Sequence, residues 1–235
     1  MDPTPESFTP ELSVTQITDK FNSVIKDQYN TFIDGETDLT LKEEARNTLL
    51  HSARVSSLLE GFAQKKEIPE MKVRFGDEWV KVLNVSGLSH DVGKLDPQVL
   101  TLTAQPRKLN EQEMEIVKTH AVNGADKVTE IFDEKLSTKE KMVRDAVVNA
   151  ARWHHALTEK YPTVLEGFQI PEAVRFVNLA DFYDALRDPN RSYRPEPMTH
   201  EKAMEIIREN GVFTADELAM IDEVGRVLQS SYERL

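Results

Sequence analysis

Cysteine is absent from the 235 residues of this chain. Its absence excludes disulfide bonds, thiolate nucleophiles and metal sites built on sulfur, and it is compatible with a reducing compartment. Long apolar runs are absent too: no stretch could span a bilayer, and the first residues lack the basic and apolar regions of a secretory signal. We therefore expect a cytoplasmic protein that does not insert into a membrane.

Positive charge is scarce as well. The chain has 29 basic against 41 acidic residues, which gives a net charge of −12. Proteins that grip duplex nucleic acid or an anionic membrane surface depend on clustered positive charge, so neither is an expected partner. A negatively charged ligand would have to be met by a few local cations. The composition leaves open a homodimer or a signalling partner protein.

Strand patterns are nearly absent, and apolar residues recur at helical spacing through most of the chain. Residues 1–13 are polar and without periodicity, which is typical of a flexible tail. A short helical segment is expected over 14–40 and one larger domain over 41–235. Residues 71–75 could form a short strand or an extended connector. The predicted fold class is all-α, a compact orthogonal or bundle-like array of about seven to nine helices.

Capping signals predict where several helices begin. A short polar side chain followed three positions later by a glutamate can satisfy the free N–H groups of a first helical turn. Asp77 is a further expected cap, for the helix that leads to His90. We expect the helix that starts at Asn110 to continue through Ile131. The capping patterns are Thr40 with Glu43, Asn110 with Glu113, and Ser137 with Glu140.

The clearest chemical signal is a histidine next to an aspartate at the end of an apolar run. His90 and Asp91 are followed by a glycine and Lys94. Imidazole and carboxylate groups suit first-row metal ions, and a nearby ammonium suits a phosphate, so the stretch indicates a metal site for phosphate chemistry. The pair alone is a weak signal, because adjacent helix positions diverge by about 100°.

The distribution of the other histidines strengthens this interpretation. Each buried imidazole needs partners for both ring nitrogens, so a set of them is costly to explain by packing alone. Asp181 is an isolated carboxylate on an otherwise apolar helix, and burying it unpaired would also be costly. A shared metal centre would supply the missing partners. The histidines expected within or at the ends of apolar helices are His51, His90, His120, His154 and His155.

Taken in order, these residues carry a family resemblance. From about residue 45 to 212 the chain resembles the HD-GYP branch of the HD-domain phosphohydrolases. The resemblance implies an all-α fold around two or three metal ions, often iron or manganese. It also implies that the domain expected over residues 41–235 hydrolyses cyclic di-GMP. The matching residues are His51, His90-Asp91-x-Gly93-Lys94, Lys108-Leu109-Asn110-x-x-Glu113, His120-x-x-x-Gly124, His154-His155, Asp181-x-x-Asp184-Ala185-Leu186 and Arg191-x-Tyr193-Arg194.

The resemblance also implies roles. One metal ion would be held by His51, His90, Asp91 and Asp181, and a second by Asp91, His120, His154 and His155. Substrate phosphate would be contacted by Lys94, Arg191 and Arg194. Asp91 would bridge two divalent cations, iron or manganese, which together activate a water for attack on phosphorus. Lys94 would stabilise the charge that develops on the cyclic dinucleotide substrate.

The chain departs from the family pattern in two places. After the histidine pair the family has a glutamate and a longer Gly-Tyr-Pro loop, whereas this chain has Ala156 and a shorter segment that keeps only Tyr161 and Pro162. This change motivates an alternative: a catalytically weak or inactive sensor of cyclic dinucleotides, or a protein-interaction module. An HD-type nucleotidase acting on mononucleotides is disfavoured, because simpler HD sites need fewer ligands than this chain provides with His120, His154 and His155.

The second departure concerns the number of metal ions. Family members with a third metal ion have a glutamate four residues before the first ligand histidine, where this chain has Asn47. A neutral amide coordinates first-row cations poorly. Glu44 lies seven residues before His51, two helical turns or about 11 Å along the axis. We therefore expect two metal ions rather than three.

Overall fold

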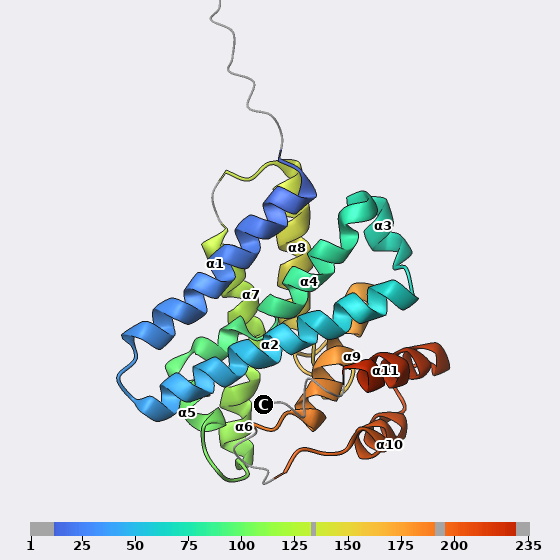
Figure 1. Cartoon of the computed structure of the whole chain (residues 1–235). Helices are drawn as coiled ribbons and strands as arrows, with labels where there is room; N and C mark the ends of the chain where they lie inside the picture. The colour runs from blue at the N-terminus through green and yellow to red at the C-terminus, as the bar shows by residue number, and fades with distance from the viewer. Residues whose placement is uncertain (1–11, 133–134, 191–195, 229–235) are drawn as a thin grey trace, which may run out of the picture.

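The structure is a computed structural model that describes residues 12–132, 135–190 and 196–228. The regular secondary structure within these ranges is entirely helical, which confirms the predicted all-α class (Figure 1). None of the described helices is both long and apolar enough to cross a membrane. The α-helices are α1 (Val14–Gly35), α2 (Leu39–Lys65), α3 (Pro69–Phe75), α4 (Trp79–Ser89), α5 (Pro97–Thr103), α6 (Glu111–Lys118), α7 (His120–Ile131), α8 (Thr138–Trp153), α9 (Glu172–Arg187), α10 (His200–Asn210) and α11 (Ala215–Val227).

Helix α2 runs across the middle of the molecule and packs most extensively against α4 and α9 (Figure 1). Its apolar face contains Val55, Leu58 and Phe62, which are fully buried. These positions recur at helical spacing, and His51, one turn before Val55, continues the same face. The hydrophobic face of α2 therefore leads directly from the core to a buried imidazole.

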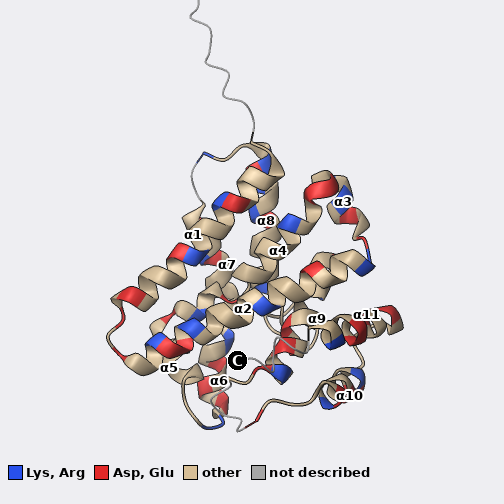
Figure 2. Ribbon diagram, viewed as in Figure 1, with Lys and Arg blue, Asp and Glu red and all other residues tan. Residues whose placement is uncertain are grey.

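Helix α1 contributes to this same core. Ile17, Phe21 and Ile25 are fully buried, and the ring of Phe21 stacks on Phe132 with 3.6 Å between centroids. α1 contacts α2, α4 and α8 along its length. Basic and acidic residues alternate along the described helices in the ribbon view of Figure 2. The acidic excess therefore does not gather into one stripe there.

The expectation of a strand or connector over residues 71–75 is wrong, because these residues belong to α3. Met71, Val73 and Phe75 alternate with charged residues, which gives a strand-like period of two. The structure buries Met71 and Phe75, which are four positions apart, and leaves Val73 87% exposed. The helical period therefore decides burial here, and Pro69 in the first turn suits the helix start.

Other helix boundaries also differ from those expected. The capping boxes at Asn110 and Ser137 are confirmed. Helix α2, however, begins earlier than Thr40 would place it, because Asp38 caps the N–H groups of its first turn. Asp77 is not a cap: it lies in the 3-10 helix η1 (Gly76–Glu78), and α4 begins directly after that helix.

The helix expected from Asn110 to Ile131 is two helices. α6 ends at Lys118, and α7 begins at His120. His120 is therefore the first residue of a helix rather than an interior one. With α3, α5 and this break, the described residues form eleven α-helices, more than the seven to nine expected.

Two glycines bring the 3-10 helix η2 (Val92–Leu95) into backbone contact with α7. A Cβ added to Gly93 would lie 2.0 Å from the carbonyl oxygen of His120 and 2.6 Å from the amide nitrogen of Gly124. Backbone atoms of α7 thus occupy the space that any larger residue would need. This contact fixes the distance between Asp91, which immediately precedes η2, and His120.

We expect the Gly93→Ala substitution to lower the free energy of unfolding by about 1–3 kcal/mol, because the clash is with backbone rather than with a flexible side-chain end. Gly35→Ala is the matched control, since nothing lies within 4 Å of its added Cβ. Urea denaturation of both variants would measure the difference. Wild-type stability of Gly93→Ala would contradict the close approach of η2 and α7.

Candidate metal centre

The ends and one face of several helices converge on a single buried cluster. α2 supplies His51 from its middle, while the turn after α4 supplies the His-Asp pair. α7 contributes its first residue, the end of α8 contributes the histidine pair, and α9 contributes an aspartate from its interior. All seven predicted metal ligands are thereby brought together and buried: His51, His90, Asp91, His120, His154, His155 and Asp181.

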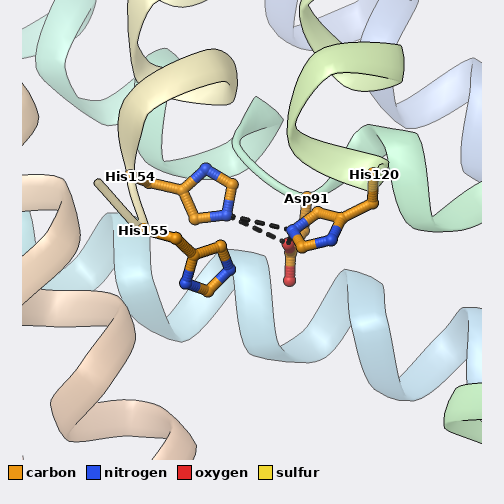
Figure 3. A group of neighbouring side chains, drawn as sticks. All are labelled: Asp91, His120, His154 and His155. Carbon is orange, nitrogen blue, oxygen red and sulfur yellow. Dashed lines mark hydrogen bonds and ion pairs between the residues drawn. The ribbon is translucent and has the colours of Figure 1, made fainter. Parts of the chain in front are cut away.

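The carboxylate of Asp91 lies between two groups of imidazoles, of which Figure 3 shows the one that contains His120, His154 and His155. Its Oδ1 atom is 3.3 Å from Nε2 of His120 and 3.6 Å from Nε2 of His154. Its Oδ2 atom is 3.4 Å from Nε2 of His51 and 3.5 Å from Nε2 of His90. Each carboxylate oxygen thus faces its own pair of ring nitrogens, as a bridging ligand between two cations must.

Asp181 closes the group around Oδ2 of Asp91. Its Oδ1 atom lies 3.1 Å from Nε2 of His51 and 3.7 Å from Nε2 of His90. Its Oδ2 atom lies 3.8 Å from Nδ1 of His155, at the edge of the other group. The two ligand groups are therefore adjacent and share the acidic side chains between them.

Hydrogen bonds behind four of the rings orient them toward the centre. Because Nδ1–H is donated outward, Nε2 is the atom that faces the cluster, and on a neutral ring it carries the lone pair, which is the usual arrangement behind a metal-bound histidine. Three acceptors are backbone carbonyls and one is a carboxylate. The Nδ1 contacts are His90 to the Gly87 oxygen at 2.7 Å, His120 to Val117 at 2.7 Å, His154 to Ala151 at 2.9 Å, and His51 to Oδ2 of Asp184 at 2.6 Å.

Two polar atoms at the centre are left without a hydrogen-bond partner in the described structure: Nε2 of His90 and Oδ1 of Asp91. An unsatisfied buried acceptor costs about 1–3 kcal/mol, so such atoms call for an explanation. A cation in each group would satisfy one of them, because His90 lies in the group around Oδ2 of Asp91 and Oδ1 faces the other group. Ligand atoms of His51, His90 and Asp91 lie within 4.8 Å of one another, as do those of Asp91 with the other three histidines. The residues present therefore fit a metal centre with Asp91 in both sites.

Charge within the cluster is finely balanced. Burial by itself would raise the pKa of Asp91, but Lys94 and His90 hold it well below its usual range. Burial would lower the pKa of His51, yet hydrogen bonds to Asp181 and Asp184 raise it to about 9. Without metal, a proton on His51 compensates the carboxylates, and a bound cation would take over that role and release the proton.

Two imidazoles of the second group are held neutral. Burial lowers the pKa of His120, and burial together with the neighbouring His154 lowers the pKa of His155 to about 4. Neutral rings carry the lone pair that a metal ion needs. These residues are therefore prepared as ligands near neutral pH.

Arg54 and Asp184 support His51 from behind, and sequence reasoning gave neither of them this role. The Arg54 guanidinium donates to both oxygens of Asp184, at 2.9 Å each for Nε and Nη2, and it also contacts Asp188. His51 and Arg54 hold the pKa of the buried Asp184 at about 2, against the effect of burial. Arg54 follows His51 by three residues on α2, which was the only sequence signal for it.

A cavity of about 420 Å³ opens onto the cluster. Lys94 lies on its wall, 9% exposed, with Nζ 2.5 Å from Oδ2 of Asp91. Arg107 and Lys108 also line it, although neither residue was expected to take part in the site. These basic side chains supply the local positive charge that an anionic ligand of an acidic protein requires.

The altered segment after the histidine pair forms another part of the cavity wall. The ring of Tyr161 stacks on that of His155, with centroids 4.6 Å apart and planes inclined by 28°. Asn47 and Glu44 line the cavity too. Arg191 and Arg194, predicted to contact phosphate, lie outside the described residues.

Comparison with solved structures supports the fold. The HD domain of the phosphodiesterase PgpH from L. monocytogenes matches with a TM-score of 0.51 and 22% identity, covering 83% of this chain and 100% of that one. The same domain in complex with cyclic-di-AMP matches equally well. The helices that surround the cluster are therefore arranged as in an HD domain.

Curated relatives extend this result to the sequence. The cyclic di-GMP phosphodiesterase PA4108 of Pseudomonas aeruginosa is 28% identical over 178 residues, which cover 74% of this chain and 38% of that protein. A cyclic di-GMP phosphodiesterase of Vibrio cholerae is 33% identical over 144 residues, 60% of this chain and 28% of that one. The 3'3'-cGAMP-specific phosphodiesterase 2 of Vibrio cholerae is 29% identical over 168 residues, 70% and 28%. The chain thus spans well under half the length of these relatives.

The family itself is established by a match along the chain. The model of the HD domain matches residues 48–186, a range that contains all seven candidate ligands. The relatives confirm the HD-GYP type that the sequence motifs indicated. The chain therefore belongs to the HD domain family.

Proposed function

We propose that this protein is a metal-dependent phosphodiesterase that hydrolyses a cyclic dinucleotide, with cyclic di-GMP as the first candidate. The observation that carries the proposal is the placement of Asp91, whose two oxygens face separate groups of imidazoles beside a cavity lined by Lys94. Relatives named for cyclic di-GMP and for 3'3'-cGAMP support this class of substrate.

Two divalent cations, iron or manganese, are the proposed cofactors. One would be held by His51, His90, Asp91 and Asp181, the other by Asp91, His120, His154 and His155. When bound, such a pair lowers the pKa of a water and neutralises phosphate oxygens. Asn47 in place of a charged ligand supports two ions rather than three.

The chain's own residues would bind and orient the substrate. Lys94 would donate to a non-bridging phosphate oxygen, a role supported by the position of its Nζ atom beside Asp91 on the cavity wall. Its charge would stabilise the additional negative charge of the transition state. Arg191 and Arg194, which follow α9 in the sequence, are proposed to hold phosphate.

A second candidate function is binding of cyclic dinucleotides without turnover. Ala156 in place of a glutamate and the shortened segment that leads to Tyr161 favour it, since this segment forms part of the cavity wall.

We also propose a cytoplasmic location, which the lack of cysteine supports. A homodimer or a signalling partner protein remains part of the proposal.

We expect metal-loaded protein to hydrolyse cyclic di-GMP to a linear dinucleotide or to a mononucleotide. Chromatography of the reaction mixture would detect this product. Lys94→Ala should reduce kcat by about 10²–10³-fold, because it removes one donor to the developing charge. Metal content should be retained, as measured by elemental analysis. Tight binding of cyclic di-GMP by wild-type protein without any product would favour the sensor instead.

The Asp91→Ala variant should lose both metal ions. Its remaining ligands would keep neither a shared carboxylate nor the cation that compensates their burial, so the melting temperature should fall as well. Elemental analysis of wild-type protein purified without chelators should give about two equivalents of metal, because Asp91 would bridge two ions. Full metal content and an unchanged melting temperature in the variant would refute the bridging role.

The Arg191→Ala/Arg194→Ala double variant should bind substrate more weakly while retaining its metal. Both arginines lie in a proline-containing segment, where truncation is expected to cost little stability. A raised KM with normal metal content and melting temperature is the expected result. Unfolding or metal loss would show that these arginines are structural.

A further inference from the structure

The ring of His155 differs from three of the other four imidazoles in what lies behind it. Within the described structure no backbone carbonyl accepts a hydrogen bond from its Nδ1 atom, in contrast to His90, His120 and His154. The nearest acidic oxygen is Oε1 of Glu159, at 3.3 Å. Oδ2 of Asp181 is 3.8 Å away, too far for a hydrogen bond.

The backbone after the histidine pair holds Glu159 in this place. The carbonyl oxygen of His155 accepts the N–H groups of both Glu159 and Lys160, at 2.9 and 3.0 Å. Lys160 has a φ of +62°, a left-handed conformation that turns the chain back toward the ring. Asn178 fixes the start of the turn by donating to the carbonyl oxygen of His154 and to Oγ1 of Thr158.

Two residues of the altered segment therefore contact the ring of His155 from different sides. Glu159 lies at the outer edge of the ring, and Tyr161 stacks on its face. Figure 3 shows one nitrogen of His155 turned toward Asp91 and His120 and the other turned away. The nitrogen beside Glu159 is Nδ1, so Nε2 is the one that faces the cluster.

We propose that Glu159 is a positioning residue of the metal centre. Its carboxylate accepts the Nδ1–H of His155 and thereby fixes the tautomer and orientation that direct Nε2 toward Asp91 and His120. A carboxylate behind a ligand histidine raises the basicity of the ring and its affinity for metal. Asp184 acts in the same way on His51 in the other group.

This inference rests on the proposed function only in taking the two histidine groups as metal sites. It gives the shortened segment a role in holding a ligand of the metal centre. The family pattern alone does not suggest this role, because the segment departs from that pattern. Glu159 stands four residues after His155, one turn along, where its side chain can return to the ring. The segment that borders the substrate cavity would then also set the strength of one metal site.

Titration of metal-free protein with Co²⁺, followed by visible absorption and competition with a chelator, tests the proposal. Wild-type protein should show two binding steps. Glu159→Ala should weaken one step by about 10–100-fold, the usual effect of removing such a partner, and leave the other unchanged. Glu159→Gln, which keeps an acceptor oxygen, should recover part of the loss.

Two further variants separate positioning from a general effect. Glu166→Ala removes an exposed carboxylate of the same segment and should leave both steps unchanged. Asp184→Asn should weaken the other step, because it acts on His51. Wild-type Co²⁺ affinities in Glu159→Ala would overturn the proposal, as would equal weakening of both steps with a lower melting temperature of the metal-free protein. Two tight steps without any phosphodiesterase turnover would instead refute the proposed function alone.

Discussion

The buried carboxylate of Asp91 is the constraint around which this molecule is arranged. A fully buried negative charge is costly unless opposite charge or hydrogen-bond donors surround it. Here Lys94 lies against one of its oxygens, and four imidazoles face the two oxygens in separate groups. Protons on the basic groups balance this charge when no metal is bound, and cations would replace them. The same balance that makes the cluster tolerable in the core therefore makes it a metal site.

Helix ends and close backbone contacts supply the geometry that this centre needs. Ligands at the end of α4, the start of α7 and the end of α8 lie where the chain changes direction, so three helices can aim short side chains at one point. The contact between Gly93 and α7 sets the spacing between Asp91 and His120. The site is rigid because it is built on packed helices, and its cavity wall is completed by the segment after His155.

The sequence was most informative where one regular pattern acted alone. Helical periodicity predicted the all-α class, and capping boxes placed the starts of α6 and α8. The sequence was misleading at α3, where apolar and charged residues alternate as in a strand. It was also misleading at Thr119, where no local signal indicates the break before His120. The candidate ligands could be named because their order and spacing resemble a known family. Arg54 and Glu159 could not be given a role, because their importance depends on contacts that only the folded chain creates.

The most direct test of the two-site centre is anomalous diffraction from crystals of the protein loaded with Mn²⁺. Two peaks about 3.5–4 Å apart are predicted, one beside each oxygen of Asp91. The first should lie among His51, His90 and Asp181, and the second among the remaining three histidines of the cluster. A single peak that does not contact Asp91, or a further peak beside Glu44 and Asn47, would contradict the account.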